Sequence, residues 1–154
     1  MKWARKLNNL IKRNFQIAGT YKKLIEVIPN ASIKNFLSQQ IAQVVTCAKE
    51  LEQEVDYLEF DSLVFRKPIS YSGFKYRSLT LLGSNAPLLL RYCIKQKKSN
   101  INLYKKALTR INEGAIREKL IRHISLFESD LQELKLLESR IASRKNRNNT
   151  LLSS

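Results

Sequence analysis

The chain has 154 residues, 44% of them hydrophobic, which is enough to bury one core and excludes an intrinsically disordered protein. Its four glycines and three prolines are too few for the many turns of an all-β fold, so long helices are expected. The formal net charge of +15 attracts anions and aids solubility, but it does not by itself indicate nucleic-acid binding.

The first predicted element is a helix over residues 2–28. Its apolar positions recur every three or four residues, and Asn14 is the one polar position in this series. The first 25 residues contain no acid, which leaves a transit peptide or a membrane-surface helix as alternatives. The regular apolar face favours a core helix instead. No apolar run is long enough for a membrane span, and a cytoplasmic location is expected.

A second helix is predicted over residues 33–58, with Ser32 as its N-cap after the break at Pro29. Residues 59–84 mix aromatic residues with one proline and two glycines. This segment is too long for a tight hairpin between helices. We therefore expect it to return along the protein as a crossover.

The third helix is predicted over residues 85–112. Asn85 can cap it, and Pro87 lies in the first turn, where proline is tolerated. Lys97 interrupts the apolar face, and Gly114 suits a helix C-terminus.

The fourth helix is predicted over residues 115–143, followed by a basic polar tail, residues 144–154, that is expected to fray. The whole pattern predicts an all-α protein. We expect residues 1–143 to form one four-helix bundle with a long crossover between the second and third helices, as in ferritin-like proteins.

Residues for metal or catalytic chemistry are sparse. A carboxylate-bridged di-metal bundle needs two Glu-x-x-His motifs, and the only histidine is His123, which we expect to flank the apolar face. Cys47 and Cys93 match no zinc or redox spacing and are predicted to be buried thiols. No phosphate-binding glycine loop or catalytic triad is recognisable. The prediction is a protein that is not an enzyme, with no catalytic residue, no cofactor and no metal site.

A polar layer is predicted at mid-height in the bundle, and it comprises Asn14, Gln43, Lys97 and Glu128. A buried ammonium without a partner would cost several kcal/mol. Lys97 can avoid that cost by extending its stem to solvent, or by pairing with Glu128 on the neighbouring helix.

The first and third helices carry most of the excess positive charge. Their basic residues predict one anion-binding surface, because a crossover makes these two helices neighbours. The candidate residues are Lys12, Arg13, Lys22, Lys23, Lys95, Lys98, Lys105 and Lys106. Such charged faces are also found simply as solvated surface, and aromatic residues that would stack on single strands are scarce here.

Three stretches resemble a bacterial ferritin-like domain of unknown function, distantly related to rubrerythrin and ferritin. They are "LNNLIKRNFQIAGTYKKLIEVI", "IKNFLSQQIAQVVTCAKELEQEV" and "INLYKKAL". The residues that match the family pattern are Leu7, Asn8, Tyr21, Tyr104, Ala107 and Leu108. The resemblance spans about residues 7 to 137.

The resemblance implies the fold but not its metal site, because the family's acidic positions fall on Ala18, Gln43 and near Lys97. The first hypothesis is thus a non-catalytic, metal-free bundle that acts as a small structural, stress-related or interaction protein, with an unknown partner or with itself. The second is a module that binds nucleic acid or an anionic surface. The third is a ferritin-like metal-binding oxidase.

Overall fold

The computed structural model describes residues 2–57 and 81–152, and these residues are almost entirely helical, with no strand among them. The predicted all-α class is confirmed for this part of the chain. A short helical turn spans residues 81–84. The predicted crossover, residues 59–84, lies mostly outside the described residues. The four long helices are α1 (Lys2–Ile25), α2 (Ala31–Tyr57), α5 (Ala86–Leu108) and α6 (Gly114–Leu152).

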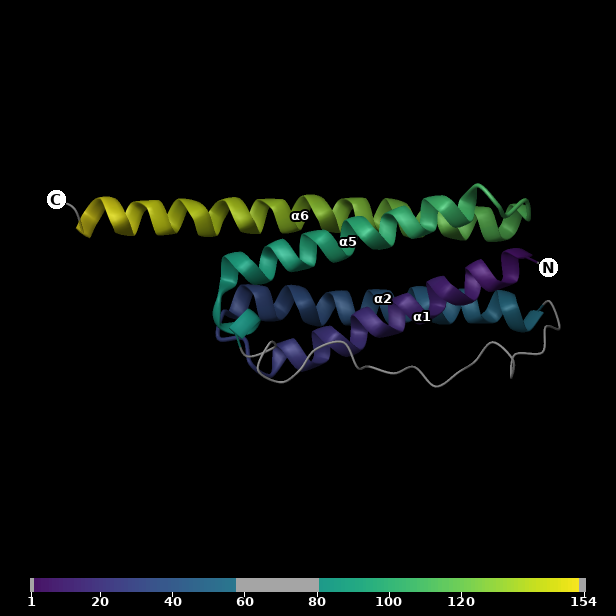
Figure 1. The fold of residues 1–154 in the computed structure, drawn as a ribbon, viewed down its shortest axis with the longest axis horizontal. Helices are drawn as coiled ribbons and strands as arrows, with labels where there is room; N and C mark the ends of the chain where they lie inside the picture. Colours follow the sequence, from purple (N-terminus) through teal and green to yellow (C-terminus); the bar gives the residue numbers. More distant parts are fainter. Residues whose placement is uncertain (1, 58–80, 153–154) are drawn as a thin grey trace.

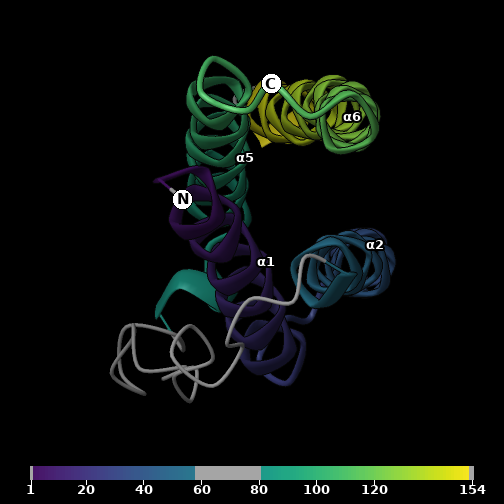
Figure 2. The ribbon, with the colours of Figure 1, turned by 90° about the vertical axis from the view of Figure 1, so that its right-hand side faces the viewer.

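The helices form two antiparallel pairs. α1 packs along α2, and α5 packs along α6, while narrower contacts join α1 to α5 and α2 to α6 (Figure 1). Seen end-on, α1 and α5 form one side of the molecule and α2 and α6 the other (Figure 2). α2 and α5 run in the same direction, so the end of α2 and the start of α5 lie at opposite ends of the molecule. The predicted contact between the first and third long helices is confirmed.

Asparagine side chains cap the N-termini of α2 and α5. Asn30 Oδ1 accepts a hydrogen bond from the backbone N–H of Ile33 at 3.0 Å, so α2 begins two residues before the predicted start. Ser32, the predicted cap, instead lies inside the first turn. Asn85 Oδ1 accepts from the backbone N–H of Leu88 at 3.2 Å, which confirms the predicted cap of α5.

The predicted boundaries around Gly114 are wrong. α5 already ends at Leu108, and Gly114 opens α6 instead of ending the helix before it. The guanidinium of Arg117 donates to the carbonyl oxygens of Leu108 and Ile111 at 2.6 and 2.8 Å, which satisfies acceptors at this turn. α6 continues to Leu152 because residues 115–152 contain neither glycine nor proline to stop it. The predicted fraying tail is therefore helical through Leu152.

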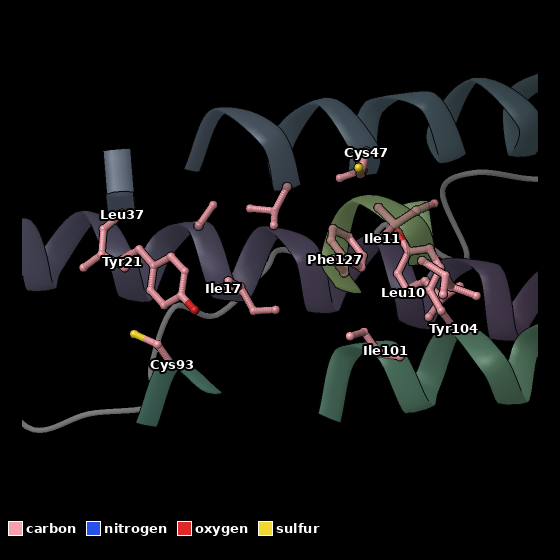
Figure 3. Close-up of a cluster of buried hydrophobic side chains, with 14 of the residues drawn as sticks. Leu10, Ile11, Ile17, Tyr21, Leu37, Cys47, Cys93, Ile101, Tyr104 and Phe127 are labelled. Atoms are coloured by element: carbon pink, nitrogen blue, oxygen red, sulfur yellow. The ribbon is translucent and has the colours of Figure 1, made fainter. Parts of the chain in front are cut away.

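The core lies between the four helices and includes large aromatic side chains. Tyr104 and Phe127 pack edge to face, with ring centroids 5.1 Å apart, beside Leu10 and Ile11 of α1 (Figure 3). Within the described residues, none of the helices combines the length and the apolar content that crossing a membrane requires.

The predicted burial of the two cysteines is confirmed. Burial raises the pKa of each thiol to about 12, so both remain protonated at neutral pH.

Candidate functional site

A buried polar layer runs across the middle of the core. Every long helix contributes to it, and its residues are Asn14, Gln40, Lys97, Asn100, Tyr104, His123 and Asp130, with Glu50 at its edge. The layer has two parts, one around the ammonium of Lys97 and one around the imidazole of His123.

Lys97 projects from α5 into the core and is only 2% exposed. Its Nζ donates a hydrogen bond to Gln40 Oε1 of α2 at 2.6 Å and lies 3.6 Å from Asp130 Oδ2 of α6. The same ammonium lies 4.6 Å from the ring centroid of Phe127, within range of a cation–π interaction. Burial lowers the pKa of Lys97, and the nearby Asp130 carboxylate opposes that shift. Lys97 is thus held as an internal cation by groups from two other helices.

Both sequence-based interpretations of Lys97 are wrong. The side chain does not reach solvent, and its carboxylate partner is Asp130 instead of Glu128. Glu128 is 51% exposed and lies 3.5 Å from the ammonium of Lys105, which is itself 57% exposed. Two residues along an α-helix correspond to a rotation of about 200°, so Asp130 faces the core when Glu128 faces away.

Gln43 is half-buried, and its Oε1 accepts from Gln40 Nε2 at 3.2 Å. It therefore borders the buried polar layer through Gln40. Asn14 is fully buried, as predicted.

The second part of the layer is a hydrogen-bonded chain that crosses all four helices. Asn100 Nδ2 donates to Asn14 Oδ1 at 3.0 Å, and Asn14 Nδ2 donates to the hydroxyl of Tyr104 at 2.7 Å. The hydroxyl lies 3.1 Å from His123 Nδ1, and His123 Nε2 lies 2.8 Å from Glu50 Oε2.

The order of donors in this chain fixes the tautomer of neutral His123. The Tyr104 hydroxyl accepts a hydrogen bond from Asn14 Nδ2 and donates its single proton to His123 Nδ1. The imidazole proton is then on Nε2 and is donated to Glu50.

The charges around His123 are set by burial and by Glu50. Burial lowers the pKa of His123, and the Glu50 carboxylate opposes that shift. Partial burial would raise the pKa of Glu50, but hydrogen bonds from Arg122 and His123 outweigh it and the pKa is lowered. The site therefore favours a neutral imidazole beside an ionised carboxylate.

Most residues of this hydrogen-bonded network were not predicted from the sequence. His123 was expected to flank the apolar face, but it is fully buried. Its position carried a signal, because His123, Phe127, Asp130 and Leu134 follow the three- and four-residue spacing of one helix face. Asn100 lies likewise between Lys97 and Tyr104 on the inner face of α5.

The arrangement offers few ligands to a metal ion. Within residues 2–57 and 81–152, no group of three or more His, Cys, Asp or Glu side chains is placed to hold one. Glu50 and His123 form one close pair of potential ligands, and each already has a protein partner. A surface groove of about 390 Å³ between α2 and α6 reaches Glu50 of this pair but not His123, and Thr46, Glu50, Arg122 and Leu126 contribute to its lining.

Comparison with protein-family models, with curated protein sequences and with solved structures returned no match. The assignment to a ferritin-like family therefore remains an inference from the residues themselves.

The residues of the predicted basic surface belong to α1 and α5, which form one side of the molecule (Figure 2). α1 contains seven basic residues and α5 contains six, and neither helix contains an acid. We call this pair of helices the basic layer. Six of the predicted anion-binding residues are exposed: Lys22, Lys23, Lys95, Lys98, Lys105 and Lys106.

The other two predicted residues are less accessible. Lys12 and Arg13 are half-buried, and Arg13 Nη2 donates to Gln96 Oε1 at 3.0 Å across the α1–α5 contact. Arg13 thus joins the two helices of the basic layer instead of lying free on its surface.

The outer face of α5 contains a shallow recess of about 360 Å³. We call it the α5 recess, and it is lined by Lys95, Lys98, Ser99, Asn102, Leu103 and Lys106. Three ammonium groups, a hydroxyl and an amide thus surround one depression, a set of donors that suits an anionic ligand.

Proposed function

We propose that this chain is a non-catalytic, metal-free bundle of the ferritin-like type that acts through its surface, as a small structural, stress-related or interaction protein in the cytoplasm. The observation that carries the proposal is the Lys97 ammonium, buried at mid-height and held by Gln40 and Asp130. Ferritin-like bundles hold their metal ions at this level, between carboxylates of facing helices.

A fixed ammonium argues against a metal ion at the same height. Two unit charges of the same sign 4 Å apart repel each other by about 4 kcal/mol at an effective dielectric constant of 20, and a divalent ion would be repelled by about twice as much. Lys97 also uses the Asp130 carboxylate that a metal ion would need. The direction of the helices supports the ferritin-like part of the proposal, because α2 and α5 run in the same direction, as a long crossover requires (Figure 1).

Metal analysis tests this proposal. Purified protein is incubated with excess Fe(II), Mn(II) or Zn(II), dialysed, and analysed for bound metal by mass spectrometry. We expect far less than one ion per chain. Stoichiometric metal that survives dialysis would contradict the proposal and favour the ferritin-like oxidase.

Two variants show whether Lys97 excludes the metal. Lys97→Gln removes the internal charge, and Lys98→Gln removes one exposed charge from the adjacent residue as a matched control. If the ammonium is what keeps metal out, only Lys97→Gln gains measurable affinity for divalent ions.

The basic layer favours a more specific use of the surface, which is the binding of an anionic partner. Its two helices lie side by side and contain no acid that would reduce the positive potential locally.

A further inference from the structure

We propose that the α5 recess binds the phosphate backbone of a nucleic-acid duplex, with Lys95, Lys98 and Lys106 on the phosphates. This inference rests on the proposed function, because it requires that the protein act through its surface. Ser99 and Asn102 supply neutral donors to the same depression.

The lysines lie on one stripe along the outer face of α5. Lys95, Lys98, Asn102 and Lys106 are separated by three or four residues and therefore share a face of the helix. They lie opposite the inner face that contains the buried Lys97. The stripe is about 16 Å long at 1.5 Å per residue, and a duplex presents one charge per about 1.7 Å of its axis. A bound duplex can thus place several phosphates along the stripe.

The charges of the stripe are available to a ligand. Lys95, Lys98 and Lys106 are exposed, and none of them forms an ion pair with another residue of the described chain. Binding a phosphate therefore breaks no existing salt bridge of these lysines. The neighbouring Lys105 differs, because it lies 3.5 Å from Glu128.

The chemistry of this face favours a duplex over a membrane or a single strand. Leu88 and Leu103 are the exposed large hydrophobic residues of α5, which is too little for the apolar face that an interfacial helix inserts into lipid. No aromatic side chain lines the recess, so bases of a single strand have no surface on which to stack. Lysines beside hydroxyl and amide donors suit backbone contacts that are independent of sequence.

Salt-dependent binding to a labelled 20-base-pair duplex of mixed sequence tests the proposal, with anisotropy measured between about 50 and 300 mM salt. The test protein carries Lys95→Gln, Lys98→Gln and Lys106→Gln. A matched control carries Lys34→Gln, Lys49→Gln and Lys135→Gln, three exposed lysines of α2 and α6. Both triple variants change the net charge equally, so only the position of the charge differs. Circular dichroism confirms that each variant is folded.

The expected result is a change in the salt slope. The salt slope is the slope of the logarithm of the binding constant against the logarithm of the salt concentration, and each lost phosphate contact reduces its size by about 0.9. The slope of the test variant should therefore be smaller by about 3, and that of the control should match the wild type. At 0.1 M salt the test variant should bind roughly 500-fold more weakly, with the difference vanishing towards 1 M.

Several outcomes would overturn the proposal. They are no duplex binding by folded wild-type protein at 50 mM salt, equal loss in both triple variants, tighter binding to a single strand of the same length, or binding only to vesicles with 30% anionic lipid. These outcomes concern the surface alone. Failure of the proposed metal-free core appears instead as bound metal in the wild type, with or without duplex binding.

Discussion

Replacing Asp130 by Asn should destabilise the protein because it removes the carboxylate nearest to the buried Lys97 ammonium. Asn keeps the shape of the side chain, so the charge is the main change. Lys97 would retain its hydrogen bond to Gln40 but would lose its counter-charge in a position that is 2% exposed.

The size of the effect follows from the geometry. A separation of 3.6 Å at an effective dielectric constant of 20 gives a gross attraction of about 4.6 kcal/mol. Measured losses on breaking buried pairs are about 3–5 kcal/mol. Asp130 is 13% exposed, and water can offset part of the loss, so we expect about 3 kcal/mol. Lys97→Met should cost much less, because it also removes the desolvation penalty of the ammonium.

Urea denaturation followed by far-ultraviolet circular dichroism measures these effects. The double variant Lys97→Met with Asp130→Asn should recover most of the loss caused by Asp130→Asn alone. Glu128→Ala is the control, since its exposed pair with Lys105 should contribute less than about 1 kcal/mol. The reasoning fails if Asp130→Asn costs under 1 kcal/mol, or if the two substitutions act additively.

Two further predictions concern the groups around His123 and the thiols. Because burial lowers the pKa of His123, the unfolded chain binds a proton below about pH 6.5 that the folded protein resists, and stability should fall as the pH decreases from 7 to 5. The lowered pKa of Glu50 adds to this loss of stability below about pH 4.5. In melting curves, His123→Gln should reduce the fall in stability between pH 7 and 5. An unchanged fall in this variant would contradict the role of His123. Cys47 and Cys93, with thiol pKa values of about 12, should react with Ellman's reagent at pH 8 only after unfolding, and rapid labelling of native protein would refute their burial.

The spacing of apolar residues was sufficient to predict the four long helices, and the long link after the second helix predicted the contact between the first and third. Strong local signals, such as Asn85 before Pro87, also predicted one helix start correctly. The end of α6 was missed because a polar, basic composition was taken to predict fraying, although no glycine or proline interrupts the helix.

The buried polar layer was only partly predictable. Lys97 and Asn14 stood out because each interrupts an apolar face, and both are buried. Their partners could not be identified from one helix alone, since the choice between Glu128 and Asp130 depends on the rotation of α6 against α5. His123 was misjudged because a single histidine without a second ligand motif gives no spacing to interpret, whereas its role depends on Tyr104 and Glu50 from two other helices.

Several buried polar contacts join one helix pair to the other, and this affects how the two pairs align. Asn14 of α1 bonds to Tyr104 of α5, Gln40 of α2 to Lys97 of α5, and Glu50 of α2 to His123 of α6, so each of these bonds joins one pair to the other. Apolar side chains tolerate a shift of one heptad along a helix, about 10 Å, because leucine then meets leucine. The same shift would separate Asn14 from Tyr104, Lys97 from Gln40 and Glu50 from His123 at once, and would leave buried polar groups with fewer hydrogen bonds. The polar layer thus acts as a register mark that permits one alignment of the two halves during folding.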